Sequence, residues 1–517
     1  MNQISCPTCG APVSFRSAAS VMAVCDYCKS TLVKDADSVK SIGKMSEVLE
    51  DYSPIQINTS GTVDGRSFTV VGRIQLRYTE GFWNEWYVLD DHGEGAWLSD
   101  ASGQYTFTRA VDASALHAGP LLGKSARFES LAPGAPLDLG KAPDGSRLVF
   151  IASDIRTAQC TGGQGELPFT VGASYTARVA DFRRGKEFLT LDYSDDGVDQ
   201  SAGSPSLFRG RSVTLDEMQC QLLRDPETIK DNAGRFKGKI SNLECPSCGS
   251  AIAFSPGATT HLLCPSCHAA IDASGPVAEV IAAAQRIEAV HTTVPLGAKA
   301  TIATTSYTVI GVMRRAEISE EASEWTEYLL YAPQKGFVWL VETDKGWERA
   351  DVLDGWPYWY SASQAVFDGT TYDKLYDYNA VVRYAAGAFN WRVEVGDTHE
   401  ITEFQHGTFK LAAEANDAEL TWSRSTPVAP KDLVQWFGKE VDAQALANAA
   451  RSAAPAAMPP GGYRRAAKWM TILLLAINAI PILFSPGRAL VVVILAAIGL
   501  YFPAWLLDKA ASRSANS

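Results

Sequence analysis

Alternating apolar and polar positions recur along the chain and predict short β-strands. Residues 62–72 read TVDGRSFTVVG, which is two β-branched runs around an Asp-Gly pair that favours a tight hairpin. Residues 301–311 read TIATTSYTVIG and repeat this pattern. An aromatic stretch follows each hairpin, at residues 83–89 and 325–331, and each leads to a Trp-Leu pair. Compact β-barrels or sandwiches are the expected architecture for such strands.

Apolar residues at helical spacing interrupt the strand pattern at four places. Residues 35–52 are typical of a short amphipathic helix or a linker, and residues 273–292 predict a helix in an alanine-rich run. Short helical signals also end each half of the chain, at residues 215–223 and 430–437.

The last part of the chain predicts a transmembrane helical hairpin at residues 468–508. Two mainly apolar runs of 16 and 19 residues flank a Ser-Pro-Gly-Arg turn. At 1.5 Å per residue they span roughly 24 and 28 Å, and the first is short for a bilayer core. Basic residues lie on both sides of the hairpin, so the positive-inside rule places both of its ends in the cytoplasm. The alternative is a helical hairpin that is buried in a soluble core.

The two halves of the chain are related by a duplication. A Cys-Pro-x-Cys-Gly motif and a later Cys-x-x-Cys motif return after 239 residues with identical internal spacing. The strand pattern stays in register as far as the Trp-Leu pair, apart from three extra residues in the second copy. We therefore expect a tandem repeat in a mainly β, multidomain protein. The expected domains are zinc ribbon 1 (1–34), a helix or linker (35–52), β modules 1a (53–110) and 1b (111–223), a linker (224–243), zinc ribbon 2 (244–272), a helix (273–292), β modules 2a (293–352) and 2b (353–440), a tether (441–467), the hairpin (468–508) and a cytoplasmic tail (509–517).

The eight repeated cysteines predict two structural zinc ions. Two Cys-x-x-Cys turns about fifteen residues apart can close a tetrahedral cage of four thiolates. Four thiolates fill the coordination sphere of zinc and leave no position for water or substrate, which favours a structural role. Cysteines in this arrangement also point to a reducing cytosol. The ligands are Cys6, Cys9, Cys25, Cys28, Cys245, Cys248, Cys264 and Cys267.

Composition and charge exclude some classes of protein. A chain of 517 residues with 46% apolar and 20% charged residues is an ordinary folded protein with several domains. The net charge is −12, and the segment from Arg464 onward is basic by +5, which leaves −17 on residues 1–463. An acidic body repels phosphate backbones, so we do not expect nucleic-acid binding.

The common catalytic motifs are absent from the sequence. It contains no phosphate-binding glycine loop, no His-Glu-x-x-His, no Gly-x-Ser-x-Gly and no dinucleotide fingerprint. The seven histidines are scattered and have no counterparts between the copies. The sequence therefore favours a protein that is not an enzyme, although catalytic groups can converge from distant positions.

Aromatic and acidic residues on the predicted strands form a candidate ligand or partner surface. They could build an aromatic cage in which a carboxylate holds a cation. The alternative is one packed aromatic face with the glutamate turned to solvent. The residues are Trp83, Glu85, Trp86 and Trp97 in the first copy, and Trp325, Glu327, Tyr328 and Trp339 in the second.

These motifs together resemble a bacterial family, the domain of unknown function numbered 4178. The resemblance rests on the cysteine motifs, Tyr-Thr-Val-Ile-Gly at 307–311, Trp-Thr-Glu-Tyr-Leu-Leu at 325–330 and Gly-Glu-Leu-Pro-Phe at 165–169. It covers most of residues 1–440, and the first copy departs from it with Trp86 in place of tyrosine. The family implies no activity, although similar proteins tend to lie beside small membrane proteins and polyamine-synthase-like enzymes.

The function expected from the sequence is a scaffold or adaptor that faces the cytosol and is anchored in the inner membrane. Residues 1–467 and the C-terminus would lie in the cytoplasm, and the duplicated modules would bind other membrane-associated proteins. One alternative is a module that binds, or acts on, a small polyamine-like cation. A zinc-ribbon regulator that binds nucleic acid is a further alternative, which the acidic charge disfavours.

Overall fold

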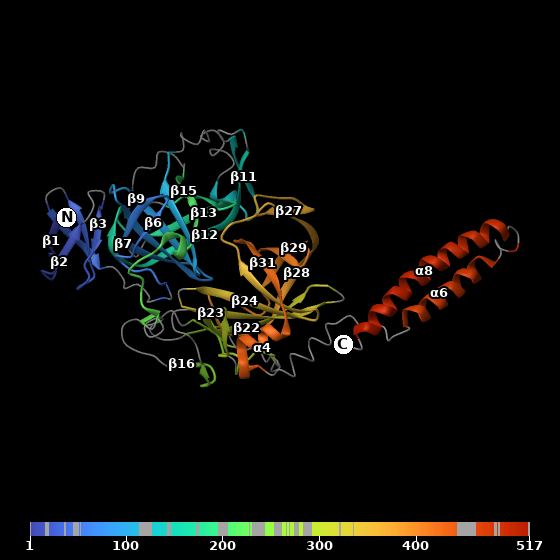
Figure 1. The fold of residues 1–517 in the computed structure, drawn as a ribbon. Coiled ribbons are helices and arrows are strands. Elements are labelled where there is room, and N and C mark those ends of the chain that lie inside the picture. Colours follow the sequence, from blue (N-terminus) through green and yellow to red (C-terminus); the bar gives the residue numbers. More distant parts are fainter. Residues whose placement is uncertain are drawn as a thin grey trace. The chain divides into compact units, whose positions relative to one another are not determined.

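The chain forms two compact units, Met1–Leu446 and Ala447–Ser517. The first contains all the strands and the second is a helical hairpin (Figure 1). The computed structural model describes residues 2–514 except 16–19, 36–37, 45–50, 52, 113–126, 142–144, 146, 172–174, 195–204, 227, 230–242, 253–260, 265, 268, 273–278, 283–291, 320–321, 334, 442–461, 480–482 and 484–485.

Each copy begins with a ribbon made of a two-stranded hairpin and a three-stranded sheet. The chain reverses at Cys-x-x-Cys turns because their short loops carry Gly10 and Gly249 in the left-handed conformation. The first ribbon contains β1 (Asn2–Ser5), β2 (Pro12–Phe15), β3 (Met22–Val24), β4 (Ser30–Asp35) and β5 (Ser38–Lys44). The second contains β16 (Leu243–Glu244), β17 (Ala251–Ile252), β18 (His261–Leu263), β19 (Ala270–Asp272) and β20 (Glu279–Ala282).

The helix predicted at residues 273–292, and the helical alternative of the helix or linker predicted at residues 35–52, are wrong where the structure describes these segments. Strand β5 pairs with β4, with Ser38 opposite Asp35, and β20 pairs with β19. The ribbon sheet therefore continues into both segments, and pairing with a neighbouring strand overrides the helical spacing of their apolar residues. The remaining parts of both predictions lie outside the described residues.

The strands that follow each ribbon form a closed antiparallel ring of eight. In the first barrel the order is β12-β13-β14-β15-β10-β9-β8-β7, and β7 pairs again with β12. The second barrel has the order β28-β29-β30-β31-β25-β24-β23-β22, closed by the pairing of β22 with β28. The two β modules expected in each half are thus not separate, because their strands share one ring. Figure 1 shows the first barrel in blue to green and the second in yellow to orange.

Most of these strands have similar lengths in the two copies. In the first barrel and beside it lie β6 (Ser60–Val63), β7 (Arg66–Arg77), β8 (Phe82–Asp90), β9 (Gly95–Ala101), β10 (Gln104–Ala110), β11 (Pro136–Lys141), β12 (Arg147–Leu167), β13 (Thr176–Arg184), β14 (Glu187–Asp192) and β15 (Ser206–Val213). In the second copy lie β21 (Lys299–Ile302), β22 (Thr305–Glu317), β23 (Glu324–Ala332), β24 (Gly336–Thr343), β25 (Gly346–Val352), β26 (Trp359–Tyr360), β27 (Gln364–Phe367), β28 (Thr370–Phe389), β29 (Thr398–His406), β30 (Phe409–Ala415) and β31 (Leu420–Val428).

Glycines allow the ring to close where two strands approach most closely. Gly72 on β7 pairs with Gly165 on β12, and an ideal Cβ on Gly72 would lie 1.8 Å from the carbonyl oxygen of Glu166. No side chain fits at that distance, so only glycine permits this contact. The second barrel repeats the pair as Gly311 and Gly387.

Each ribbon is continuous with its barrel. Strand β3 pairs with the end of β12 at residues 165–167, and β18 pairs with the end of β28 at residues 387–389. One long strand therefore belongs to the ribbon sheet and to the barrel at once, which fixes the ribbon against the barrel wall.

Short helices follow both barrels, as the sequence predicted. Helix α2 (Leu215–Met218) begins at a capping box in which Thr214 and Glu217 bond each other's backbone amides. Helix α4 (Pro430–Phe437) starts at a proline, which suits the first turn of a helix. Two 3₁₀ turns, η2 (Phe128–Ser130) and η3 (Gly438–Glu440), complete the first unit over its described residues.

The second unit consists of α6 (Gly462–Ile477) and α8 (Pro486–Ser514), which run side by side (Figure 1). A helical hairpin is therefore present, but the transmembrane hairpin expected at residues 468–508 is not found. Among the described residues no helix has the length and the apolar character needed to cross a membrane. Helix α6 has 16 residues, roughly 24 Å, and its first turns carry three basic side chains.

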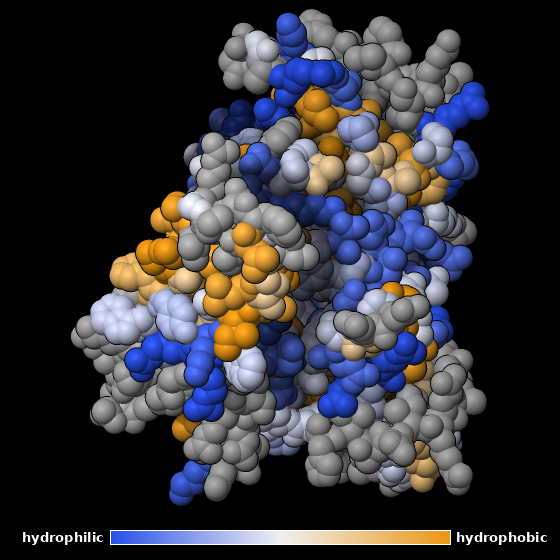
Figure 2. All heavy atoms as spheres, turned by 90° about the vertical axis from the view of Figure 1, so that its right-hand side faces the viewer, coloured by the Kyte–Doolittle hydropathy of each residue, from blue (hydrophilic) through white to orange (hydrophobic). Residues whose placement is uncertain are grey.

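The hairpin nevertheless exposes many large apolar side chains. Orange apolar spheres gather on the face turned to the reader in Figure 2. The exposed residues include Trp469, Met470, Ile472, Leu473, Leu475 and Ile477 on α6, and Val491, Val492, Ile494, Leu495, Ile498, Phe502 and Trp505 on α8. Large exposed apolar patches on proteins occur at protein and membrane interaction sites.

Candidate metal centres and barrel interiors

The eight predicted cysteine ligands lie in two clusters of four, one in each ribbon. Within each cluster all four Sγ atoms lie within 4.8 Å of one another. The Sγ atoms of Cys6 and Cys28 are 3.6 Å apart, and those of Cys248 and Cys264 are 3.8 Å apart. Two sulfurs bound to one tetrahedral zinc at 2.3 Å lie about 3.8 Å from each other, so the clusters fit such an ion.

Backbone turns hold the sulfur atoms in place. The amide of Gly10 donates to the carbonyl of Cys6 at 2.8 Å, and the amide of Gly249 donates to Cys245 at the same distance. Two cysteines of each cluster are buried, one is partly exposed and one is exposed. Each cluster thus lies at the edge of its ribbon, where four thiolates can coordinate one metal ion.

Several polar side chains of each ring point into its interior. In the second barrel, Arg315 on β22 lies 2.8 Å from Glu414 on β30, and these two strands do not pair but face each other across the ring. In the first barrel, Asp181 on β13 and Asp192 on β14 act electrostatically on Glu85 of β8, although neither strand pairs with β8. The outward faces of the strands are largely apolar and are covered by other segments, such as Ile55 and Met218 over the first barrel.

The predicted aromatic and acidic residues fall on both faces of their strands. Trp83 and Glu85 point into the first barrel, where the indole Nε1 donates to Glu85 Oε1 at 2.8 Å. Trp325 donates to Glu327 Oε1 in the same way at 2.6 Å. The glutamates are therefore not turned to bulk solvent, because residues two apart on a strand share one face.

The other predicted aromatic residues have structural surroundings. Trp86 and Tyr328 lie on the outward face and are fully buried there. The hydroxyl of Tyr328 donates to Glu342 Oε2 at 2.6 Å. Trp97 packs on Tyr87, with ring centroids 5.1 Å apart, and Trp339 packs on Trp391 at 5.5 Å. The eight residues thus do not form one surface.

Burial changes the acidity of Glu85. Removal from water is the largest cause that raises the pKa of Glu85 to about 7. The nearby charges of Asp181 and Asp192 also act upward, and hydrogen bonds from Ser99 and Trp83 act against them. Burial likewise raises the pKa of Asp181 to about 6. At neutral pH Glu85 is therefore about half-protonated, whereas Asp181 is mostly ionised.

The second barrel carries cations of its own beside its carboxylates. Arg315 Nη1 lies 3.4 Å from Glu327, and Lys410 Nζ lies 2.6 Å from Glu348. Burial raises the pKa of Glu414, but the guanidinium of Arg315 outweighs it and leaves that pKa lowered. Asp181, Arg315 and Glu414 were not predicted as site residues from the sequence, although the Asp-Phe and Glu-Phe pairs at 181–182 and 403–404 recur between the copies.

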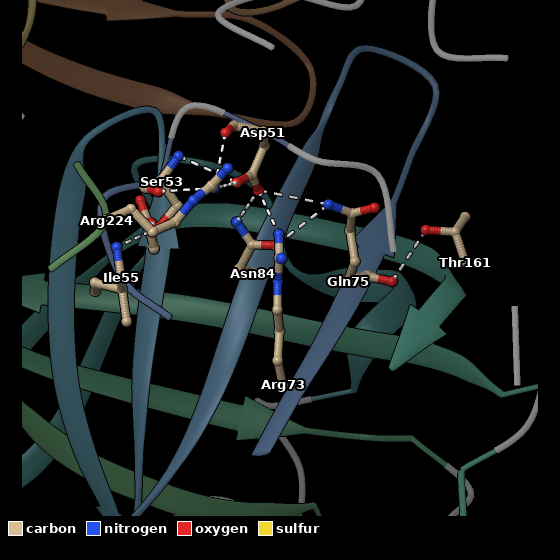
Figure 3. A network of polar contacts seen from close by, with 9 residues as sticks. Asp51, Ser53, Ile55, Arg73, Gln75, Asn84, Thr161 and Arg224 are labelled. Atoms are coloured by element: carbon tan, nitrogen blue, oxygen red, sulfur yellow. Dashed lines mark hydrogen bonds and ion pairs between the residues drawn. The ribbon is translucent and has the colours of Figure 1, made fainter. Parts of the chain in front are cut away.

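A third polar group lies outside the first barrel and is buried (Figure 3). Asp51 Oδ2 accepts hydrogen bonds from Arg73 at 2.5 Å and from Asn84 at 2.6 Å. Arg224 donates to the backbone carbonyls of Asp51 and Ser53, each at 3.0 Å. This group, which we call the Asp51 network, joins Asp51, Ser53 and Arg224 to strands β7 and β8, and its role is structural.

One protein family matches the chain in two places. The family described as Domain of unknown function (DUF4178) matches residues 56–214 and residues 295–430. These segments coincide with the two barrels, from β6 to β15 and from β21 to β31. No curated protein matches the chain.

Proposed function

The chain belongs to the DUF4178 family as two tandem copies, each preceded by a four-cysteine ribbon, and we propose that it is a membrane-associated scaffold for partner proteins. The observation that carries this proposal is the duplication of a complete unit, ribbon and barrel together, on one chain. Two equivalent binding units on one chain raise the apparent affinity for a repeated partner through effective concentration. No catalytic role is part of the proposal.

In this proposal each ribbon holds one zinc ion with a structural role. The Sγ separations of 3.6 to 3.8 Å agree with tetrahedral zinc, and four thiolates are the set that structural zinc sites prefer. Zinc would stabilise ribbons whose cores are small, because metal binding and folding are coupled in such units. Reduced cysteines also support a location in the cytoplasm.

The hairpin is the proposed attachment to the membrane. Its exposed apolar side chains would leave water for the lipid, and Arg464, Arg465 and Lys468 at its start would meet anionic headgroups. The first unit would then remain on the cytoplasmic side of the inner membrane, with its partners among other membrane-associated proteins. The charge of −17 on residues 1–463 argues against nucleic acid as the partner.

The test is affinity purification of the full-length protein from gently solubilised native membranes, at moderate salt and with nuclease, read by mass spectrometry. We expect a stoichiometric protein partner that still binds after deletion of residues 463–517, while the deleted protein leaves the membrane fraction. A protein recovered alone would refute the scaffold. A deleted protein that stays on membranes, with an isolated hairpin that is soluble, would refute the attachment.

A further inference from the structure

We propose that the first ribbon is a site of oxidation by hydroperoxides, and that Cys9 is the sulfur that reacts first. The inference rests on the zinc ion that the proposed function assigns to each ribbon, but not on the scaffold role. It comes from a comparison of the two cysteine clusters, which have the same geometry but receive hydrogen bonds differently. Oxidation opens the first cluster before the second.

The two clusters present equivalent sulfur atoms to solvent. Cys9 is the exposed ligand of the first ribbon, and Cys248, its equivalent, is the exposed ligand of the second. Cys28 and Cys267 are partly exposed, and the other two ligands of each cluster are buried. An oxidant reaches an exposed thiolate first, so oxidation of the ribbons begins at Cys9 or Cys248.

The hydrogen bonds to these two sulfur atoms differ. Cys248 Sγ accepts hydrogen bonds from the backbone amide and from the side-chain hydroxyl of Ser250. Cys9 Sγ accepts one from the amide of Ala11, and alanine has no hydroxyl to add. Ala11 and Ser250 are equivalent, since each follows its exposed cysteine by two residues. The exposed sulfur of the first ribbon therefore lacks the hydroxyl donor that the second ribbon provides.

The first ribbon has its hydroxyl beside a less exposed ligand. Ser30 is buried, and its Oγ lies 3.1 Å from Cys28 Sγ. Ala269 stands at the equivalent position in the second ribbon, two residues after Cys267. The hydroxyl thus reaches the exposed sulfur in the second ribbon but not in the first.

A hydrogen bond to a thiolate lowers the reactivity of the sulfur with an oxidant. The donor occupies a lone pair with which the sulfur would attack, and this bond must weaken as the sulfur reacts. Hydrogen bonds to charged groups contribute more than those between neutral groups, so the effect is large enough to measure. Cys9 therefore reacts faster than Cys248, although both are exposed.

The reaction requires a hydroperoxide and a second thiolate. Cys9 Sγ attacks one oxygen of hydrogen peroxide, an S–O bond forms, the O–O bond breaks and hydroxide leaves. Cys25 Sγ lies 3.7 Å from Cys9 Sγ and attacks the resulting sulfenic sulfur, so that an S–S bond forms and a second hydroxide leaves. The two thiolates lose two electrons and the peroxide gains them. Cys6 and Cys28 then remain, and two thiolates are too few for a structural zinc site.

The oxidised pair lies beside the joint between ribbon and barrel. Cys25 directly follows β3, whose last residue, Val24, is opposite Gly165 near the end of β12. Gly165 is also opposite Gly72, where the ring of the first barrel closes. Loss of the cluster therefore loosens β3 and the end of β12, and oxidation of the ribbon is felt in the barrel.

The direct test is the release of zinc from the full-length protein by hydrogen peroxide, followed with a chromophoric chelator. We expect two phases of one ion each, the first about three- to tenfold faster, a difference typical of one hydrogen bond. Peptide mapping without reduction should find a disulfide between Cys9 and Cys25 after the first phase. Equal rates of release, or first oxidation in the second ribbon, would overturn this proposal alone. Zinc is measured before the peroxide is added, and a protein without zinc would refute the zinc sites and this proposal with them.

Exchanging the residues beside the exposed sulfur atoms tests the cause. Ala11→Ser supplies a hydroxyl to Cys9 and should slow the fast phase. Ser250→Ala removes the hydroxyl from Cys248 and should speed the slow phase by a similar factor. Ser247→Ala is the matched control, since Ser247 is exposed in the same turn, and it should leave both phases unchanged. Unchanged rates in both exchanged variants would overturn the assignment to the hydroxyl.

Hydrogen exchange gives a second readout that needs no variant to fold. After the first phase, exchange should become faster at β3 and at residues 165–167, which pair with each other. Exchange at β18 and at residues 387–389, the equivalent joint of the second copy, should stay unchanged. Equal changes at both joints, or none at the first, would overturn the proposal.

Discussion

Replacing Asp51 by alanine should destabilise the first barrel strongly. The carboxylate of Asp51 is fully buried and accepts hydrogen bonds from Arg73 and Asn84, while Arg73 is only 3% exposed. The variant leaves the guanidinium of Arg73 buried beside the ring of Trp86, 4.6 Å away, without its counterion. Removing one partner of a buried ion pair lowers the free energy of unfolding by about 3–5 kcal/mol, because the remaining charge is kept from water and has no counterion.

The assay is urea denaturation followed by tryptophan fluorescence, combined with hydrogen exchange to locate the loss. Asp91→Ala is the matched control, since Asp91 is half exposed and pairs only with an exposed histidine, and it should cost less than about 0.5 kcal/mol. We expect faster exchange at β7 and β8 in the Asp51 variant, with β22 and β23 of the second barrel unchanged. A loss below about 1 kcal/mol, or unchanged exchange at β7, would refute the reasoning, because the network would then contribute no more than an exposed pair.

Three further predictions concern other parts of the fold. Zinc analysis of the purified protein should find two ions per chain. The double variant Cys9→Ser and Cys25→Ser should keep one zinc ion, while the barrel strands keep their protection from hydrogen exchange. Two ions in that variant would contradict the ligand assignment. Gly72→Ala should lower the free energy of unfolding by several kcal/mol in thermal unfolding, because its Cβ would clash with a backbone carbonyl. Gly65→Ala, in an open turn with φ of +78°, should lower it by only about 1 kcal/mol. Equal losses of stability would argue against closure of the ring at Gly72. The pKa of Glu85 is raised to about 7 in the folded chain, so the folded state keeps this proton to a higher pH than the unfolded state does, and the free energy of unfolding should fall as pH rises from about 4.5 to 7. In denaturation at pH 5 and pH 8, Glu85→Gln should reduce this pH-dependent difference by up to about 3 kcal/mol. An unchanged difference would mean that Glu85 is in contact with water.

The repeat and the metal ligands could be predicted from the sequence because both depend on local spacing. Cysteines three residues apart fix a turn by themselves, and the 239-residue offset is visible without any structure. Strand content followed from β-branched runs around turn residues. The ring closure could not be predicted, since it pairs Leu76 with Cys160 across more than eighty residues and depends on register.

The interior of the barrels was the least predictable part. The tryptophan and glutamate two positions apart share a face, but nothing local says whether that face points to a core, to water or into a ring. Buried apolar residues lie on both faces of β8, with Trp86 and Val88 on one face and Tyr87 and Leu89 on the other, so the hydrophobic pattern alone does not identify the inner face. Only the contacts across the ring, such as Arg315 with Glu414, identify the inner face.

The strand shared between ribbon and barrel sets an order of events during synthesis. Val24 of the first ribbon pairs with Gly165, which the ribosome adds about 140 residues later. At about 5–20 residues per second, this delay is roughly 7 to 28 s. The nascent ribbon can bind its metal in that time, but the edge of β3 stays open until β12 arrives. The pairing of β3 with β12 therefore depends both on metal binding to the ribbon and on the speed of translation. A chain that stalls after the ribbon has folded and before β12 is made would expose the unpaired edge of β3 to neighbouring chains.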